Sequence, residues 1–322
     1  MMAKILVTRK IPDHFVQQLE QFGEVEMWDK ALVPMPRAKF LTAIKDATAC
    51  FITLSEQIDH EVIAQAPQLR IVANMAVGYD NIDISLAKSR DIVVTNTPDV
   101  LTETTAELGF TLMLSVARRI VEAEKYVQDG RWTSWGPYLL SGKDVYGSTV
   151  GIFGMGAIGQ AFARRLTGFN TRTLYHNRSR REDVERELKV TYADFDTLLE
   201  ESDFVICTAP LTVETKNKFN AEAFQAMKQD AIFINIGRGA IVDEDALVFA
   251  LEQGDIAGCG LDVLREEPIN EKHPLLSMPN AVILPHIGSA SVKTRNRMIQ
   301  LCVDNIVAVL QQQAPLTPVT SH

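Results

Sequence analysis

Residues 149–166 read TVGIFGMGAIGQAFARRL and contain the features that decide the fold. The apolar run Thr149–Phe153 predicts a buried strand, a glycine-rich turn follows it directly, and a helical run comes next. In a turn of this G-x-G-x-x-G pattern, Gly154 permits the tight bend, Gly156 lets a pyrophosphate approach the backbone, and Gly159 lets helix and strand pack closely. The N-terminus of the helix adds N–H donors for phosphate groups. The stretch therefore predicts a dinucleotide-binding βαβ unit.

Short apolar runs alternate with helix-like patterns on both sides of this stretch. Ahead of it, the predicted strands are Lys4–Thr8, Ala49–Thr53, Arg70–Asn74 and Ile92–Thr95. From residue 149 onward, six strands are predicted, namely Thr149–Phe153, Thr171–Tyr175, Phe204–Thr208, Ala231–Asn235, Ala257–Asp262 and Ala281–Leu284. Helices are expected between the strands, among them Asp13–Phe22 and His60–Ala66. Such alternation predicts an α/β chain with doubly wound parallel sheets, covered by helices on both faces.

A long helix-like stretch, from about Thr102 to Gln128, separates the two series of strands. The segment Arg131–Gly147 that follows is rich in Trp, Gly, Ser and Tyr, and we expect a loop with aromatic anchors there. A last helix is expected over about Val292–Gln311.

Composition excludes several classes of protein. The 322 residues suffice for two domains, and 32 basic against 41 acidic residues give a net charge of −9. This balance disfavours nucleic-acid binding and polybasic attachment to membranes. No apolar run reaches the roughly 18 residues of a membrane span, and the N-terminus lacks the apolar region of a signal peptide. The cysteines (Cys50, Cys207, Cys259 and Cys302) are not spaced as zinc ligands, and Cys207 and Cys259 are expected in the core. We expect a cytoplasmic protein without a metal site.

The residues after the second strand of the nucleotide-binding unit indicate which cofactor is bound. An NAD binder usually carries a carboxylate about 20 residues beyond the glycines. This sequence instead reads HNRSRR over residues 176–181. The side chains of Asn177, Arg178, Ser179 and Arg180 can hold a 2′-phosphate, so the segment favours NADPH over NADH. The alternative is a solvated basic start of a helix, in which case either cofactor would serve.

Three residues that follow predicted strands form a candidate catalytic set. Arg238 follows Phe233-Ile234-Asn235, Glu267 follows Gly260-Leu261-Asp262, and His286 follows the final strand. Ligands of doubly wound folds bind at the carboxyl ends of strands. Ketone reduction needs a cation that orients a carboxylate and polarises the carbonyl, a histidine that donates a proton, and a carboxylate that fixes the tautomer of the histidine. Singly, each residue also has a structural explanation, and spacing alone does not separate the two.

The whole chain resembles the D-isomer specific 2-hydroxyacid dehydrogenases. The stretches that carry the resemblance are VGYDNID (77–83), the glycine motif, Asn235–Asp243, Gly260–Pro268 and Pro285–Ser289. The resemblance implies a Rossmann dinucleotide-binding domain of residues 101–289 and a flavodoxin-like substrate domain of residues 1–100 and 290–322. It also implies that the active site lies in the cleft between the two domains.

The resemblance further assigns roles to individual residues. His286 would be the general acid/base, Glu267 its partner, and Arg238 the residue that binds the substrate carboxylate and carbonyl. Substrate would also contact Leu54, Ser55, Val77 and Gly78. Cofactor contacts would come from Thr105, Gly154, Gly156, Ala157, Ile158, Gly159, Asn177, Arg178, Ser179, Arg180, Ala209, Pro210, Thr215, Ile236, Gly237, Asp262, Gly288 and Ser289. Ala157 departs from the family pattern, because relatives often carry Arg there and gain a pyrophosphate contact.

The branch of the family is indicated by GRWTSW (130–135), TPDVLTET (97–104) and the basic cofactor segment. These resemble glyoxylate and hydroxypyruvate reductases, and 2-ketogluconate reductases share the same signatures. We therefore expect NADPH-preferring reduction of a small 2-keto acid by a homodimer, without nucleic-acid or membrane partners. Trp135 would either reach the partner's pocket or be buried at the dimer interface. The alternatives are a dinucleotide-sensing corepressor-like scaffold and an NAD-dependent dehydrogenase of another 2-hydroxy acid.

Overall fold

Two parallel sheets organise the chain, and each belongs to its own compact unit. A computed structural model describes residues 2–320. The central unit comprises Thr102–Ala290, and the terminal unit comprises the described residues up to Leu101 and from Ser291 onward. Among the helices of residues 2–320, none combines the length and the apolar character that crossing a membrane requires.

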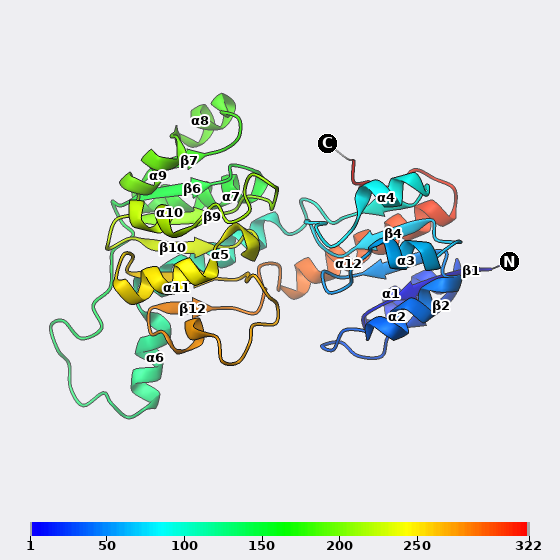
Figure 1. The fold of residues 1–322 in the computed structure, drawn as a ribbon, viewed down its shortest axis with the longest axis horizontal. Coiled ribbons are helices and arrows are strands. Elements are labelled where there is room, and N and C mark those ends of the chain that lie inside the picture. Colours follow the sequence, from blue (N-terminus) through cyan, green and yellow to red (C-terminus); the bar gives the residue numbers. More distant parts are fainter. Residues whose placement is uncertain (1, 321–322) are drawn as a thin grey trace. The chain divides into compact units, whose positions relative to one another are not determined.

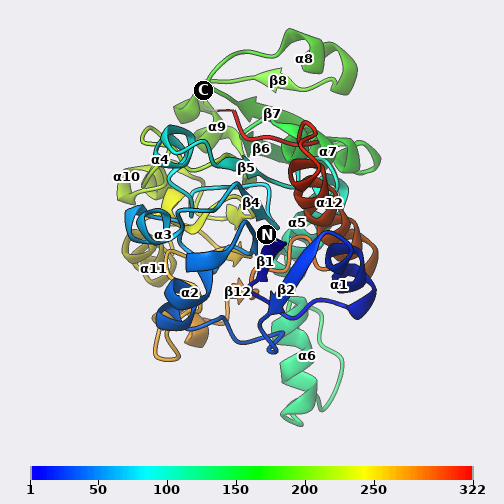
Figure 2. The ribbon, with the colours of Figure 1, turned by 90° about the vertical axis from the view of Figure 1, so that its right-hand side faces the viewer.

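The terminal unit contains a five-stranded parallel sheet in the order β2-β1-β3-β4-β5. Its strands are β1 (Ala3–Val7), β2 (Gly23–Met27), β3 (Ala49–Ile52), β4 (Ile71–Asn74) and β5 (Val93–Thr95). Its helices are α1 (Asp13–Glu20), α2 (Arg37–Ala43), α3 (His60–Gln65), α4 (Ile84–Ser89) and α12 (Val292–Leu310), with a 3₁₀ turn at Ile44–Asp46. Helices α1 and α12 cover one face of the sheet, and α2, α3 and α4 cover the other (Figure 2).

The central unit contains a seven-stranded parallel sheet in the order β12-β11-β10-β9-β6-β7-β8. Its strands are β6 (Thr149–Phe153), β7 (Arg172–His176), β8 (Thr191–Tyr192), β9 (Phe204–Cys207), β10 (Ile232–Asn235), β11 (Gly258–Leu261) and β12 (Ala281–Ile283). Its helices are α5 (Thr102–Ala117), α6 (Ile120–Gln128), α7 (Ala157–Leu166), α8 (Glu182–Leu188), α9 (Phe195–Glu201), α10 (Ala221–Ala226) and α11 (Glu244–Gln253), with 3₁₀ turns at Thr167–Phe169, Gly239–Ile241 and Pro274–Ser277. Helices α5, α7 and α8 cover one face, and α9, α10 and α11 cover the other (Figure 1).

The predicted fold class, two doubly wound parallel sheets, is confirmed. Every residue of β9, β10 and β11 is buried, as expected for a sheet covered on both faces. Cys207 and Cys259 lie fully buried within β9 and β11, as predicted. The prediction missed two strands at sheet edges. Strand β2 alternates charged with apolar residues, and β8 has only two residues, so neither forms the continuous apolar run of a central strand.

The single helix expected from Thr102 to Gln128 is wrong, because the chain forms two helices there. Arg119 adopts a left-handed backbone (φ 51°) between α5 and α6. The carbonyl of Ala117 accepts a hydrogen bond from Lys143 N (2.8 Å), and Gly142 packs directly against that carbonyl. This carbonyl would otherwise bond within a continuing helix, so the contact with residues 142–143 ends α5.

The segment after α6 is a loop, as predicted, but its aromatic residues are not buried anchors. Trp132, Trp135 and Tyr138 are 61%, 81% and 87% exposed. The indole of Trp135 makes no hydrogen bond or ring contact within residues 2–320. The loop is therefore not held to the central unit by these rings.

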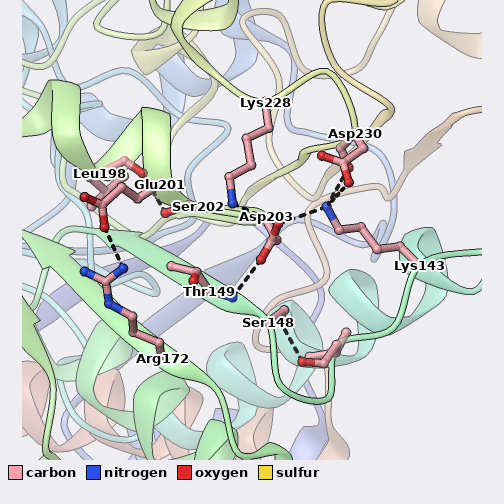
Figure 3. Close-up of polar contacts among 11 residues, drawn as sticks. Lys143, Ser148, Thr149, Arg172, Leu198, Glu201, Ser202, Asp203, Lys228 and Asp230 are labelled. Atoms are coloured by element: carbon pink, nitrogen blue, oxygen red, sulfur yellow. Dashed lines mark hydrogen bonds and ion pairs between the residues drawn. The ribbon is translucent and has the colours of Figure 1, made fainter.

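At the amino ends of the strands of the central sheet, the carboxylate of Asp203 bonds to several neighbouring segments (Figure 3). Its Oδ2 accepts a hydrogen bond from Thr149 N at the start of β6 (2.8 Å). Its Oδ1 lies 3.2 Å from Lys143 Nζ and 3.0 Å from Lys228 Nζ. Burial alone would raise the pKa of Asp203, but these donors hold it below its usual value. The carboxylate, which directly precedes β9, thus joins the start of β6 to the loops that precede β6 and β10.

Replacing Asp203 with Asn should lower the free energy of unfolding at pH 7 by about 1–2 kcal/mol, since charge-assisted hydrogen bonds are lost. A carboxyl group whose pKa is lowered in the folded state stabilises fully above its unfolded pKa, about 3.9. This stabilisation is lost progressively as the pH falls from there through the lower pKa of the folded state. Urea unfolding between pH 7 and pH 3 should therefore show the difference from the unmodified chain shrinking. Asp230→Asn, at an exposed partner of Lys143, is the control and should cost less than about 0.5 kcal/mol. Equal losses in both variants would contradict this role of Asp203.

Candidate active site

Three adjacent strands of the central sheet lead to the candidate catalytic residues. Strand β11 lies between β10 and β12, and all three run parallel. Arg238 follows β10, Glu267 follows β11, and His286 follows β12. Because the carboxyl ends of parallel strands share one edge, the topology brings the three connections together.

Glu267 and His286 form a hydrogen-bonded pair. Glu267 Oε2 lies 2.7 Å from His286 Nδ1, and Glu267 Oε1 accepts a hydrogen bond from Leu264 N at 2.9 Å. Burial alone would raise the pKa of Glu267, but the hydrogen bond to His286 and the nearby charges of His286 and Arg238 hold it below its usual value. The carboxylate therefore stays ionised near neutral pH and holds Nδ1 of the ring, which leaves Nε2 for a ligand.

The turn that carries His286 is held by the buried side chain of Asp262. His286 has a left-handed backbone (φ 53°), which is uncommon for a residue with a side chain. The two N–H groups that follow, of Ile287 and Gly288, donate to Oδ1 and Oδ2 of Asp262, each at 2.7 Å. Asp262 is 2% exposed, and burial raises its pKa although these N–H donors oppose the shift. Both carboxylate oxygens thus serve to fix the direction of the histidine.

Arg238 lies in a turn that its neighbours organise. The side chain of Asn235, fully buried at the end of β10, donates to Arg238 O (3.0 Å) and accepts from Gly237 N (3.0 Å). Arg238 Nη1 donates to the carbonyl of Gly237 (2.9 Å). The half-buried guanidinium lies close enough to Glu267 to contribute to its low pKa. The arrangement offers a cation for an anionic substrate group beside a proton donor.

The glycine-rich turn between β6 and α7 lies at the point where the strand order reverses. Gly154 has φ 104°, and a Cβ there would lie 2.6 Å from Ala209 N. A Cβ on Gly159 would lie 2.1 Å from Gly154 O, so helix and strand approach closely. A Cβ on Gly156, which precedes the first turn of α7, would meet no described atom within 4 Å. The turn thus fits the pyrophosphate of a dinucleotide, with Ala157 and Ile158 beginning the helix.

The basic segment after β7 does not offer all its arginines to a ligand. Arg180 makes a two-point contact with Glu185, with both nitrogen–oxygen distances 2.8 Å. Arg181 pairs with Asp183 at 3.1 Å. By contrast, the exposed Arg178 makes no hydrogen bond or ion pair within residues 2–320, and the carboxylate of Glu214 lies near enough to feel its charge. Asn177 accepts from Met155 N (3.4 Å), which ties the segment to the glycine-rich turn.

The other predicted cofactor residues of the central unit gather at the same edge of its sheet. A Cβ on Gly288, beside Ser289, would lie 3.1 Å from both Asp262 Oδ2 and Thr105 Cγ2. A Cβ on Gly237, beside Ile236, would lie 2.7 Å from Ala209 O. Thr215 Oγ1 donates to Pro210 O (2.8 Å), which closes the loop after β9. The connection after β12 therefore contacts the start of α5, and the connections after β9 and β10 contact each other.

The predicted substrate residues of the terminal unit occupy two loops that side-chain amides hold. Leu54 and Ser55 follow β3, and Val77 and Gly78 follow the adjacent β4. Side-chain amides of Asn96 and Asn74 donate to the carbonyls of Val77 (2.8 Å) and Gly78 (2.9 Å). Because the N–H and C=O groups of a trans peptide point in opposite directions, the next N–H groups face away from these amides. The backbone can thus present donors to an anion.

Comparison with known proteins identifies the family. Residues 110–288 match the family described as D-isomer specific 2-hydroxyacid dehydrogenase, NAD binding domain. The chain is 48% identical to a glyoxylate reductase of Pyrococcus horikoshii, over 98% of this chain and 96% of that protein. The chain belongs to the D-isomer specific 2-hydroxyacid dehydrogenase family. The protein is therefore an oxidoreductase whose cofactor is a nicotinamide dinucleotide.

Further relatives of this dehydrogenase agree. It is 47% identical to a glyoxylate reductase of Korarchaeum cryptofilum, over 98% of this chain and 95% of that protein. The crystal structure of the TT0316 protein from Thermus thermophilus superposes with a TM-score of 0.92 at 43% identity, covering 98% of this chain and all of that one. An NADPH-dependent glyoxylate/hydroxypyruvate reductase from Sinorhizobium meliloti, solved with NADP and malonate, gives 0.87 at 40% identity, covering 99% and 97%.

Sequence reasoning missed several residues that shape the site of this dehydrogenase. Asn235 precedes the Arg238 turn, Glu185 engages Arg180, and the buried Glu244 contacts the loop before Glu267. Glu244 and Glu185 look like ordinary helical acids in sequence. Their positions gave one signal in the sequence. Asn235 begins the stretch Asn235–Asp243, which resembles the family strongly, and Glu244 directly follows it.

Proposed function

We propose that this dehydrogenase reduces small 2-keto acids to D-2-hydroxy acids, with NADPH as the preferred cofactor. Glyoxylate and hydroxypyruvate are the first candidates, and 2-ketogluconate is a further one. The observation that carries the proposal is the 2.7 Å contact between His286 Nδ1 and Glu267 beside Arg238. The names of the relatives, glyoxylate reductase and glyoxylate/hydroxypyruvate reductase, support the choice of substrates.

Each proposed catalytic residue has one task. The nicotinamide, when bound, supplies the hydride for the carbonyl carbon. His286 Nε2 donates the proton that the carbonyl oxygen needs, because Nδ1 is engaged by Glu267. Glu267 stabilises the ring while it is protonated and keeps its orientation. Arg238 binds the substrate carboxylate and polarises the carbonyl. Leu54, Ser55, Val77 and Gly78 stay predicted substrate contacts.

The preference for NADPH rests on the segment that follows β7. No carboxylate stands between His176 and Arg181, so nothing there repels a 2′-phosphate. Arg178 is the guanidinium that the protein leaves for such a group, with Ser179 beside it, whereas Arg180 is engaged by Glu185. We therefore assign the charge contact with the phosphate to Arg178.

A homodimer is also proposed. Helix α6 has no buried residue, and its side chains Ile120, Val121 and Val127 are about half exposed. Trp132 and Trp135 in the following loop are exposed as well. Exposed apolar and aromatic side chains are typical of subunit interfaces, and a second copy of this chain would cover those of α6 and of the loop after it. Sedimentation velocity of the purified protein measures this state directly.

Replacing His286 with Ala should lower kcat for glyoxylate about 10²–10⁴-fold with little change in KM, because the proton donor is lost. Replacing Arg238 with Ala should raise KM and lower kcat together, since binding and polarisation are both lost. The measurement follows NADPH absorbance at 340 nm with glyoxylate, hydroxypyruvate or 2-ketogluconate. His60→Ala, an exposed histidine of α3, is the control. Tight NADPH binding without turnover of any acid, or normal turnover in His286→Ala, would contradict the proposal.

Replacing Arg178 with Ala should lower kcat/KM for NADPH about 10–100-fold, the usual cost of one charge-assisted hydrogen bond, and leave NADH almost unchanged. Arg180→Ala is the matched control, because Glu185 already holds that guanidinium. In this control variant, kcat/KM for NADPH should stay within about threefold of the value for the unmodified enzyme. Steady-state kinetics with both cofactors decide the matter. A larger loss in Arg180→Ala than in Arg178→Ala would show that the phosphate contact is misassigned.

A further inference from the structure

One buried carboxylate of the central unit has no part in the proposed chemistry. Glu244 is the first residue of α11 and is only 4% exposed. Burying a carboxylate is costly unless donors surround it. Asp243, its neighbour, already caps the helix by accepting from the N–H groups of Asp245 and Ala246. The burial of Glu244 therefore needs another explanation.

The partners of Glu244 lie in the loop that leads to Glu267. Its Oε1 accepts a hydrogen bond from Arg265 N, and its Oε2 lies 3.5 Å from His273 Nε2. The preceding N–H, of Leu264, donates to Glu267 itself. Two successive backbone donors thus go to two carboxylates, one from α11 and one from the loop's own Glu267. The contact of Arg265 N with Glu244 thus fixes the backbone whose neighbouring N–H, that of Leu264, donates to Glu267.

The same loop also touches the turn of Arg238. A Cβ on Gly239 would lie 1.8 Å from the carbonyl carbon of Leu264 and 2.4 Å from Arg265 N. The two backbones are therefore in direct contact, with no side chain between them. A shift of the Leu264–Arg265 peptide would therefore displace both the Glu267 side chain and the turn that carries Arg238.

We propose that Glu244 is a positioning residue, which holds the Arg265 N–H so that Glu267 stays within hydrogen-bonding distance of His286. The proposal rests on the proposed function, because it takes His286 as the proton donor. What matters is the reach of the Glu244 side chain to Arg265 N rather than its charge. The ion-pair distance to His273 is too long to replace that contact.

Two substitutions separate reach from charge. Glu244→Asp keeps the charge but shortens the side chain by one methylene, so the Arg265 N–H loses its acceptor unless the loop moves. Glu244→Gln keeps the length and an acceptor oxygen but removes the charge. The control is Asp245→Ala, because Asp245 contacts the exposed side chain of Arg265 and not its backbone.

The readout is the pH dependence of kcat/KM for glyoxylate reduction with saturating NADPH. Reduction consumes a proton that the Glu267–His286 pair holds, so activity falls at the alkaline end, and the midpoint of that fall reports on the contact within the pair. In Glu267→Gln, measured in parallel, the midpoint should move down by about one pH unit. Glu244→Asp should move it by about half as much and lower kcat about fivefold. Glu244→Gln and Asp245→Ala should stay near the unmodified enzyme.

Hydrogen exchange of the peptide covering residues 262–268 gives a second measurement that does not depend on turnover. A positioning role predicts faster exchange there in Glu244→Asp than in Glu244→Gln. If Glu267→Gln moves the midpoint but Glu244→Asp behaves like Asp245→Ala, the positioning role is overturned and the proposed function stands. A larger effect of Gln than of Asp overturns it too, because charge would then matter more than reach. If Glu267→Gln leaves the midpoint in place, the proposed proton donor fails and this inference falls with it.

Discussion

The two hydrogen bonds that Asp262 accepts from Ile287 N and Gly288 N are the interaction on which the candidate site depends. They hold a turn whose key residue, His286, has a left-handed backbone that costs of order 1 kcal/mol or more. A buried carboxylate without donors would itself be unstable, so the carboxylate and the turn stabilise each other. The imidazole consequently meets Glu267 in one defined orientation, which is what a proton donor requires.

Buried carboxylates that accept hydrogen bonds from backbone N–H groups hold loops at two other places in the protein. In the terminal unit, the buried Glu56 accepts from the N–H and hydroxyl of Thr53 and so holds the loop that carries Leu54 and Ser55. In the central unit, Glu244 accepts from Arg265 N. Each of these carboxylates bonds to backbone N–H groups at the carboxyl edge of a parallel sheet. Donors fixed before a ligand arrives do not have to reorganise during the reaction, and this preorganisation is a main source of catalytic power.

Much of the fold could be predicted from the sequence, because buried strands of a parallel sheet are continuous apolar runs and the glycine-rich turn has a fixed context. The required glycines, Gly154 and Gly159, follow from backbone approaches that leave no room for a side chain. The break between α5 and α6 could not be predicted, since it depends on residues 142–143 taking the carbonyl of Ala117. Strands β2 and β8 lie toward the edge of their sheets and lack a clear apolar pattern.

The same distinction applies to the site. The types and order of Arg238, Glu267 and His286 could be anticipated, because each follows a recognisable strand within a familiar pattern. Which arginine of the segment 177–181 is left for a phosphate could not be anticipated, since it depends on Glu185, a residue of the next helix that sequence alone does not pair. Likewise, nothing in sequence distinguishes the buried Glu244 from an exposed helical acid.

The most direct test of this account is the single-turnover rate of NADPH oxidation in Asp262→Asn, at saturating cofactor and glyoxylate. The amide has one acceptor oxygen, so one N–H of the His286 turn loses its partner and meets another donor. The account predicts at least a tenfold lower rate at saturating cofactor, a loss that the predicted contact of Asp262 with the cofactor would not by itself produce. An unchanged rate, or a loss confined to cofactor affinity, would contradict the claim that Asp262 acts by holding the turn of the proton donor.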